Sequence, residues 1–197
     1  MSNVINPVVL VHGINDTSAK LRLIANCLRR LGRKVYSIDL SPNDGTALLE
    51  ISASQLQNFI DEHIPVPQKF DLIGFSMGGL VTRYYMQRLG GIDRVEHYVT
   101  IAAPHQGTLA AYFTNRPGCV QMRPDSTFIQ DLQQDVQMLA QIKFTSIWTP
   151  FDLIILPPSS SQVAVGKEVQ LPVAIHPWMV QDQRSIAAVL AALEINI

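Results

Sequence analysis

The sequence has little charge and almost no cysteine. Only 16% of its 197 residues are charged and 47% are hydrophobic, whereas an ordinary soluble domain carries about 25% charged residues. The net charge is −1, with neither a basic patch nor an acidic tail, so nothing favours binding to nucleic acid or to an anionic membrane. The shortage of charge fits either a large core covered on both faces or a surface that meets apolar substrate. Composition alone favours the large core.

Two cysteines, Cys27 and Cys119, are too few for a disulfide framework. They could pair, but a reducing compartment is the simpler interpretation. No secretory signal precedes the first predicted strand, and no apolar run reaches the roughly 20 residues that a membrane span needs. We therefore expect a soluble, cytoplasmic protein. The five histidines are dispersed and neither cysteine has a partner at ligand spacing, so we expect neither a metal nor a cofactor.

Short apolar runs alternate with helical patterns along the chain. The runs are continuous and rich in β-branched residues, as in strands buried on both faces of a parallel sheet. They cover residues 8–11, 35–38, 70–74, 95–102, 144–148 and 169–175. Apolar residues at helical spacing predict helices around 21–31, 49–64, 76–89 and 186–193. The alternation predicts a single three-layer α/β/α domain over residues 1–197, with a mostly parallel sheet of about six strands.

The segment 108–142 interrupts this alternation. It begins with a loop rich in glycine and proline, and a helical pattern that includes Phe128, Leu132 and Leu139 follows a capping Ser126. Its place in the chain suits a cap or lid over a site, and it suits an ordinary crossover helix equally well. Both interpretations stay open at this point.

A strand–turn–helix pattern surrounds Ser76. The segment Gly74-Phe75-Ser76-Met77-Gly78 matches Gly-x-Ser-x-Gly, the pattern of a nucleophile elbow, in which a sharp turn lifts the serine hydroxyl above the sheet. Glycine is needed at the flanking positions because a side chain there would collide with the neighbouring strand and helix. The N-terminus of the following helix favours negative charge that develops at the site. We therefore predict that Ser76 is a catalytic nucleophile.

A serine nucleophile needs two backbone N–H groups that face the developing oxyanion. Each such donor lowers the barrier by roughly 3 kcal/mol. The N–H of Met77, directly after the nucleophile, is the first, and the loop after the first strand should supply the second. In that loop Gly13 permits a tight turn, so Ile14 is the expected donor. His12 lies too early in the chain for the order Ser, Asp, His, and we expect it to be structural.

The serine also needs a general base, and the base needs a carboxylate that orients it. Both lie on loops after later strands in folds of this type. Asp152 follows the fifth predicted strand and His176 follows the sixth, in the order Ser, Asp, His. His105 also follows a strand and is the main alternative base, but it precedes the acid. The aspartates of segment 108–142 have the pattern of solvated helix charges.

These motifs together resemble the bacterial lipase and esterase branch of the α/β-hydrolases. The resemblance is greatest to the small lipases of the Bacillus type, which have a trimmed six-stranded sheet. It rests on the segments 11–14, 74–79, 103–108, 149–152 and 175–179, and so extends over nearly the whole chain. The smallest of these lipases are secreted and nearly lidless, whereas this chain shows no signal and carries a longer insertion.

The resemblance implies a minimal α/β-hydrolase fold and hydrolysis of carboxylic esters, commonly acylglycerols or other lipid esters, without a cofactor. Ser76, Asp152 and His176 match the family's catalytic triad, which forms a covalent acyl-enzyme. Ile14 and Met77 match its oxyanion-hole donors.

Other functions remain open at this stage. A thioesterase or an acyltransferase would use the same triad, because the difference lies in the acceptor and the pocket. A catalytically silent binding protein is a further alternative, which a missing triad member would have favoured. Ile154 and Trp178 are apolar and lie next to the proposed acid and base, where they could line an acyl pocket or make transient contact with a lipid interface. For the apolar segment 153–158, buried packing is the preferred interpretation.

Overall fold

A computed structural model describes residues 5–195 and confirms the predicted α/β architecture. One sheet holds six strands in the order β2-β1-β3-β4-β5-β6, and every pairing in it is parallel. The strands are β1 (Val8–Val11), β2 (Val35–Ile38), β3 (Phe70–Phe75), β4 (Val95–Ile101), β5 (Lys143–Trp148) and β6 (Lys167–Gln170). Because all strands run the same way, their carboxyl ends meet along one edge of the sheet.

The position predicted for the sixth strand was wrong. β6 begins two residues before the predicted range 169–175 and ends at Gln170, so residues 171–175 lie outside the sheet. β6 is one of the two edge strands, and it is mostly exposed and lacks the continuous apolar run of a buried strand. Val173 is fully buried although it belongs to a loop, so part of the apolar run reflects loop packing.

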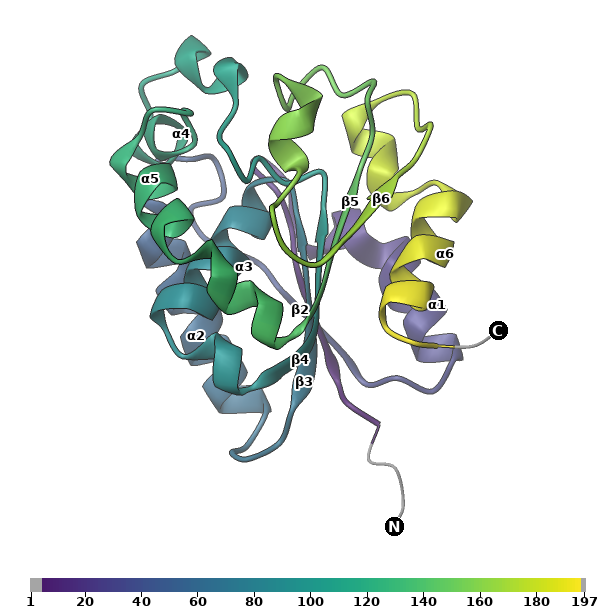
Figure 1. The fold of residues 1–197 in the computed structure, drawn as a ribbon. Helices are drawn as coiled ribbons and strands as arrows, with labels where there is room; N and C mark the ends of the chain where they lie inside the picture. The colour runs from purple at the N-terminus through teal and green to yellow at the C-terminus, as the bar shows by residue number, and fades with distance from the viewer. Residues whose placement is uncertain (1–4, 196–197) are drawn as a thin grey trace.

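Helices cover both faces of the sheet (Figure 1). On one face lie α1 (Arg22–Arg30) and α6 (Gln183–Ala192), and on the other lie α2 (Leu49–His63), α3 (Met77–Arg88) and α5 (Thr127–Gln134). All four predicted helices are confirmed. The shorter elements are α4 (Pro117–Gln121) and the 3-10 helices η1 (Ser18–Leu21), η2 (Gly91–Asp93), η3 (Leu109–Phe113), η4 (Val136–Gln141), η5 (Pro158–Ser161) and η6 (His176–Val180).

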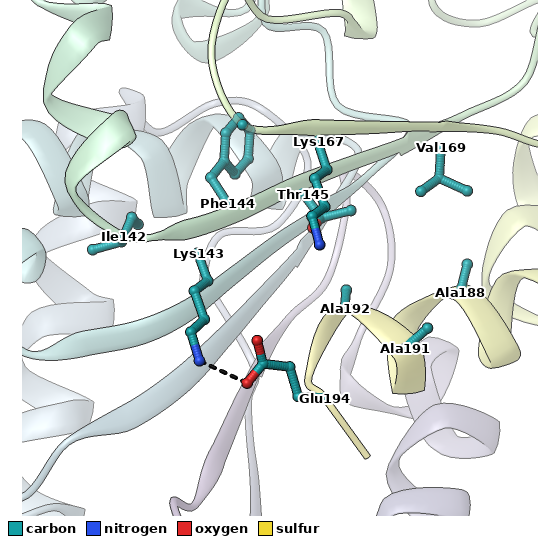
Figure 2. A pocket seen from close by; sticks show the side chains of 11 residues that line it. Ile142, Lys143, Phe144, Thr145, Lys167, Val169, Ala188, Ala191, Ala192 and Glu194 are labelled. Carbon is teal, nitrogen blue, oxygen red and sulfur yellow. Dashed lines mark hydrogen bonds and ion pairs between the residues drawn. The ribbon is translucent and has the colours of Figure 1, made fainter. Parts of the chain in front are cut away.

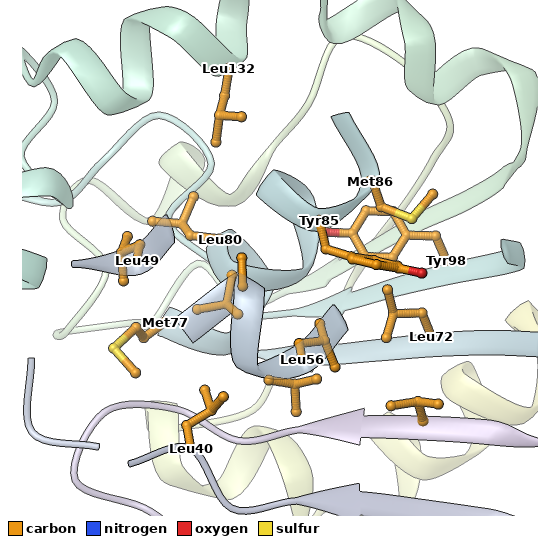
Figure 3. Packing of buried hydrophobic residues seen from close by; sticks show 14 of the residues in the cluster. Leu40, Leu49, Leu56, Leu72, Met77, Leu80, Tyr85, Met86, Tyr98 and Leu132 are labelled. Atoms are coloured by element: carbon orange, nitrogen blue, oxygen red, sulfur yellow. The ribbon is translucent and has the colours of Figure 1, made fainter. Parts of the chain in front are cut away.

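Two layers of apolar side chains, one on each face of the sheet, form the core. Leu56, Leu72 and Leu80 are fully buried in the layer beneath α2 and α3 (Figure 3). Burying a leucine side chain contributes roughly 1.5–3 kcal/mol, so two complete layers account for the low charge of the sequence. Cys27 and Cys119 belong to opposite layers, and the sheet separates their thiols.

The segment 108–142 connects β4 to β5. Ser126 caps α5 as predicted, because its Oγ accepts the N–H of Ile129 at 3.1 Å. Leu132 and Leu139 are fully buried in the same layer as α3, so this part of the segment packs as a crossover. A mobile lid in the segment stays a prediction.

Arg83 ties this crossover to α3. Its side chain is fully buried and donates hydrogen bonds to the carbonyls of His105 (2.9 Å) and Leu132 (2.6 Å) and to the side chain of Gln87 (2.8 Å). Burial lowers the pKa of Arg83 to about 10, so the guanidinium stays charged at neutral pH. The loop after β4 and the last turn of α5 are therefore held in place by one cation.

A buried charge cluster closes the opposite, amino-terminal end of the sheet. Asp71 on β3 is 1% exposed and accepts hydrogen bonds from the guanidinium of Arg33 and from Nδ1–H of His97 at 2.7 Å. Burial lowers the pKa of His97, but the hydrogen bond to Asp71 and the charge of that carboxylate outweigh it, so the pKa is raised overall. The cluster fixes β3 and β4 to the segment before β2.

Asp71→Asn should lower the free energy of unfolding by about 3 kcal/mol, because it leaves the buried Arg33 without a counter-ion. The raised pKa of His97 adds stability that is complete below about pH 6.5 and is lost as the pH rises through the folded-state value. The variant should lose this pH dependence as well. Urea titrations at pH 6 and pH 8 measure both effects.

The matched control is Asp61→Asn, which removes the exposed partner of Arg94. An exposed ion pair contributes less than about 1 kcal/mol. Equal losses in the two variants would contradict the importance of the buried cluster.

Candidate active site

Ser76 occupies a strained turn between β3 and α3. Its backbone has φ 54° and ψ −124°, which residues other than glycine rarely adopt. A Cβ added to Gly74 would lie 2.5 Å from Oγ1 of Thr82, and one added to Gly78 would collide with the carbonyl of His12. Strand, helix and neighbouring loop therefore approach so closely that only glycine fits at either side of the turn, as the motif predicts.

Three side chains from three different loops meet at the carboxyl edge of the sheet. The hydroxyl of Ser76 donates to Nε2 of His176 at 3.0 Å, and Nδ1–H of His176 donates to Oδ2 of Asp152 at 2.7 Å. All three are buried, with exposed fractions of 5%, 7% and 2%. The structure thus brings together the predicted nucleophile, base and acid in one hydrogen-bonded chain.

Local contacts hold the acid and the base in this arrangement. Oδ1 of Asp152 accepts the N–H groups of Ile154 and Ile155, both at 2.9 Å, so the carboxylate also organises its own loop. The hydroxyl of Thr149 donates to the carbonyl of Val173 at 2.7 Å, which joins the loop of the acid to the loop of the base. The orientation of the imidazole therefore depends on both loops.

The two predicted oxyanion donors lie beside the nucleophile. A Cβ on Gly13 would be 2.9 Å from the Cβ of Ser76, which places the loop of Ile14 directly against the serine. Within residues 5–195, no acceptor receives the N–H of Ile14 or that of Met77. Two unsatisfied donors next to a strained serine are the arrangement that an oxyanion would stabilise.

The other histidines at strand ends hold the structure together instead. Nδ1–H of His12 donates to the carbonyl of Gly13 at 2.8 Å, and its Nε2 accepts the N–H of Leu40 at 3.0 Å, so it fixes the loop of the oxyanion donor. His105 is fully buried and shares a hydrogen bond of 2.8 Å with Thr100. Burial, with the nearby charge of Arg83, holds the pKa of His105 well below its usual range, so this alternative base stays neutral.

Exposed apolar side chains lie on the segments that carry Asp152 and His176 and on the neighbouring 3-10 helix η3. We call them the apolar rim; they lie on η3, on the loop after β5 and around the start of η6. The rim consists of Leu109, Tyr112, Phe113, Phe151, Leu153, Ile154, Ile175 and Trp178. The Thr108 hydroxyl donates to the Ile154 carbonyl at 2.8 Å and so connects η3 to the loop after β5, which the hydrogen bond between Thr149 and Val173 connects in turn to the segment before η6. Both predicted substrate-binding residues, Ile154 and Trp178, belong to the rim.

The expectation of buried packing for segment 153–158 was wrong for most of the segment. Leu153 is 73% exposed and Ile154 is 47% exposed, Pro157 is exposed as well, and only Ile155 is buried. The carboxylate of Asp152 captures the N–H groups of the next residues and turns the chain, so only Ile155 points into the core. Sequence alone could not show this turn, because the segment reads as one continuous apolar run.

Comparison with known proteins places this site in a family. The family model for palmitoyl protein thioesterase matches residues 7–151. The chain belongs to the palmitoyl protein thioesterase family. The match includes the loop of Ile14 and the turn at Ser76, and it ends one residue before Asp152. The acid and the base are therefore assigned from the geometry of this chain.

Curated relatives agree with the family. The chain is 25% identical over 116 residues to palmitoyl-protein thioesterase 3 of Dictyostelium discoideum, which covers 56% of this chain and 40% of that protein. It is 30% identical over 107 residues to human lysosomal thioesterase PPT2, covering 51% of this chain and 34% of that protein. The matches thus span well under half of the length of these relatives.

Solved structures with the same architecture include lipases. A mature lipase of Bacillus licheniformis superposes with a TM-score of 0.77 at 14% identity, over 98% of this chain and 93% of that one. Lipase B of Aspergillus fumigatus gives a TM-score of 0.83 at 18% identity, over 98% of this chain and 53% of that one. At such low identity these likenesses show the α/β-hydrolase fold alone. The resemblance to Bacillus-type lipases is therefore right about the fold, and the family is the thioesterase family instead.

Within residues 5–195, no helix has the length and apolar character needed to cross a bilayer. The range also contains no cluster of three or more histidine, cysteine, aspartate or glutamate side chains able to bind a metal ion.

The buried, neutral His105 predicts sensitivity to acid. In the unfolded chain this histidine takes up a proton below about pH 6.5, so the free energy of unfolding should fall by up to about 1.4 kcal/mol per pH unit as the pH drops from there toward the depressed folded-state pKa. His105→Gln should flatten this slope, even if it lowers stability at pH 7. Urea titrations at pH 5, 6 and 7 measure the slope, and an unchanged slope would show that His105 is not its source.

Proposed function

We propose that this chain hydrolyses acyl thioesters, with Ser76 as nucleophile, His176 as general base and acid, and Asp152 as the orienting carboxylate. The observation that carries the proposal is the continuous hydrogen-bonded chain from Ser76 through His176 to Asp152. Membership of the palmitoyl protein thioesterase family supports a thioester of a long acyl chain as the substrate. The sequence left a thioesterase open as the alternative to a lipase that acts on carboxylic esters.

In the first half-reaction, His176 accepts the proton of Ser76 while Oγ attacks the carbonyl carbon of the thioester. The carbonyl oxygen becomes an anion and accepts hydrogen bonds from the N–H groups of Ile14 and Met77. The carbon–sulfur bond then breaks, and the proton on His176 passes to the leaving sulfur. The products of this step are a free thiol and an acyl group on Ser76.

In the second half-reaction, His176 deprotonates a water molecule that attacks the acyl-enzyme. The same N–H groups stabilise the second oxyanion, and the proton on His176 returns to Oγ of Ser76 as the fatty acid leaves. Asp152 keeps Nδ1 of the imidazole protonated and stabilises its charged form in both halves. No cofactor takes part in these steps.

The apolar rim favours a substrate with a long acyl chain. Each methylene group moved from water to an apolar surface contributes about 0.8 kcal/mol, so a rim next to the serine favours long chains over short ones. Side chains as exposed as Phe113, at 91%, could also make transient contact with a lipid interface that contains the substrate.

Ser76→Ala should lower kcat/KM for an S-palmitoyl peptide by more than about a thousandfold, because no other group can form the acyl-enzyme. Asp152→Asn should cost about as much through a misoriented imidazole. A fluorophosphonate probe should label the native chain and leave Ser76→Ala unlabelled. Ser159→Ala, which alters an exposed serine of η5, is the matched control and should keep full activity. Retained turnover in Ser76→Ala would refute the mechanism.

The preference for thioesters can be separated from that for oxygen esters. Across matched C4 to C16 substrates, kcat/KM should rise with chain length and should be higher for the thioester at each length. Phe113→Ser should lower kcat/KM for the C16 thioester by more than for the C4 thioester, since it removes rim surface that a short chain does not reach. A higher kcat/KM for oxygen esters at every length would restore the lipase interpretation.

A further inference from the structure

A cavity lies at the other end of the sheet from the triad. It is formed between α6 and the first residues of β5 and β6, as Figure 2 shows. Its volume is about 410 Å³, within the range of sites that bind small molecules. The triad lies beyond the carboxyl ends of the strands, whereas this cavity lies at the amino ends of β5 and β6. It is therefore separate from the proposed acyl site.

The cavity exists because α6 presents small side chains to the sheet. Ala188, Ala191 and Ala192 line it from the helix, and none of them is long enough to fill the space beneath the edge strand. Val169 adds further apolar surface from β6, whereas the ring of Phe144, although it borders the cavity, packs in the layer on the other face of the sheet. The wall formed by α6 and Val169 is therefore mainly apolar, which suits an aliphatic chain.

The register of the two strands turns Lys167 toward this cavity. β5 and β6 pair Ile147 with Val169 and Thr145 with Lys167. Ile147 and Val169 both pack in the apolar layer on the α6 side. Since alternate residues of a strand share a face, Thr145 and Lys167 point to the same side, and both line the cavity.

The charges around the cavity do not cancel. Lys143 pairs with Glu194 at 2.6 Å, as the dashed line in Figure 2 marks. The ammonium of Lys167 makes neither an ion pair nor a hydrogen bond with any side chain or carbonyl in residues 5–195. Two cations and one anion thus line an otherwise apolar space. An anion would find one positive charge without a partner.

We propose that this cavity binds an aliphatic carboxylate, with its chain along the alanine face of α6 and its carboxylate at Lys167. The apolar walls supply the affinity for the chain, and the unpaired ammonium supplies the selectivity for a negatively charged head group. The ligand class includes the acid that the proposed hydrolysis would release. The binding argument itself rests on the cavity and is independent of the activity.

Decanoate is a suitable probe, and its binding to the whole chain can be measured by isothermal titration calorimetry. Lys167→Gln should weaken binding about three- to tenfold, and Lys34→Gln, an exposed lysine at the opposite edge of the sheet, should leave it unchanged. Binding of uncharged decanol should not respond to Lys167→Gln. Equal decanoate affinity in all three proteins would show that Lys167 is only a solvated edge charge.

Two further variants test the walls. Ala188→Phe should fill the cavity and weaken decanoate binding more than tenfold. Ala191→Glu changes an exposed position that should tolerate it in the fold, and it should weaken binding by repelling the carboxylate. If neither variant changes the affinity, the cavity is not the site.

Two controls test whether decanoate binds in this cavity: one blocks Ser76, and the other measures self-association of the chain. Decanoate should still bind after fluorophosphonate has modified Ser76, and loss of binding in that sample would place the ligand at the rim and overturn the proposal. Light scattering reports the mass of each variant. A change of mass in Ala191→Glu without a change in decanoate affinity would make this face a contact between copies of the chain. Failure of Ser76→Ala to lose activity would refute the thioesterase proposal and leave these measurements unaffected.

Discussion

The site depends on how closely three pieces of backbone approach one another at Ser76. Gly78, the second residue of α3, faces the carbonyls of Val11 and His12 at the end of β1, and Gly79 packs against Ala103 just after β4. This contact lets the first turn of α3 sit directly above the sheet, and it holds Ser76 at a positive φ that it would not adopt alone. The strain is offset by packing on every side. The proposed nucleophile and both proposed oxyanion donors are therefore positioned by the backbone before the side chains of Asp152 and His176 contribute.

Much of this arrangement could be predicted because parallel strands place their carboxyl ends on one edge. Ser76, Asp152 and His176 are far apart in sequence, yet each lies on a segment that follows a strand, so the topology brings these segments to one edge. Residues 171–175 separate His176 from β6, so its position also depends on the packing of that loop, in which Val173 is buried. The four interior strands were predictable for a related reason, since burial on both faces leaves continuous apolar runs. At one edge, β2 is half-buried and was still predicted. At the other edge, β6 has mostly exposed residues and no such run, so its position was missed.

The family was harder to predict than the chemistry. A thioester and an oxygen ester react with the same nucleophile, base and oxyanion donors, so the motifs around Ser76 are shared by thioesterases and lipases. What distinguishes the two substrates is the surface beside the serine. That surface depends on details such as the turn after Asp152, which exposes Ile154 and buries Ile155. Two local hydrogen bonds, from backbone N–H groups to the Asp152 carboxylate, decide that exposure, and hydropathy along the chain does not encode them.

The two ends of the sheet differ in polarity. At the amino end, the buried carboxylate of Asp71 accepts hydrogen bonds from both Arg33 and His97. At the carboxyl end, Ser76, His176 and Asp152 are buried, while the rim exposes apolar side chains to solvent. Apolar side chains gathered in this way are typical of a binding site, as the proposed function requires. The scarcity of charge in the sequence therefore has two sources, since one part of the apolar surplus fills the core and another part forms the rim.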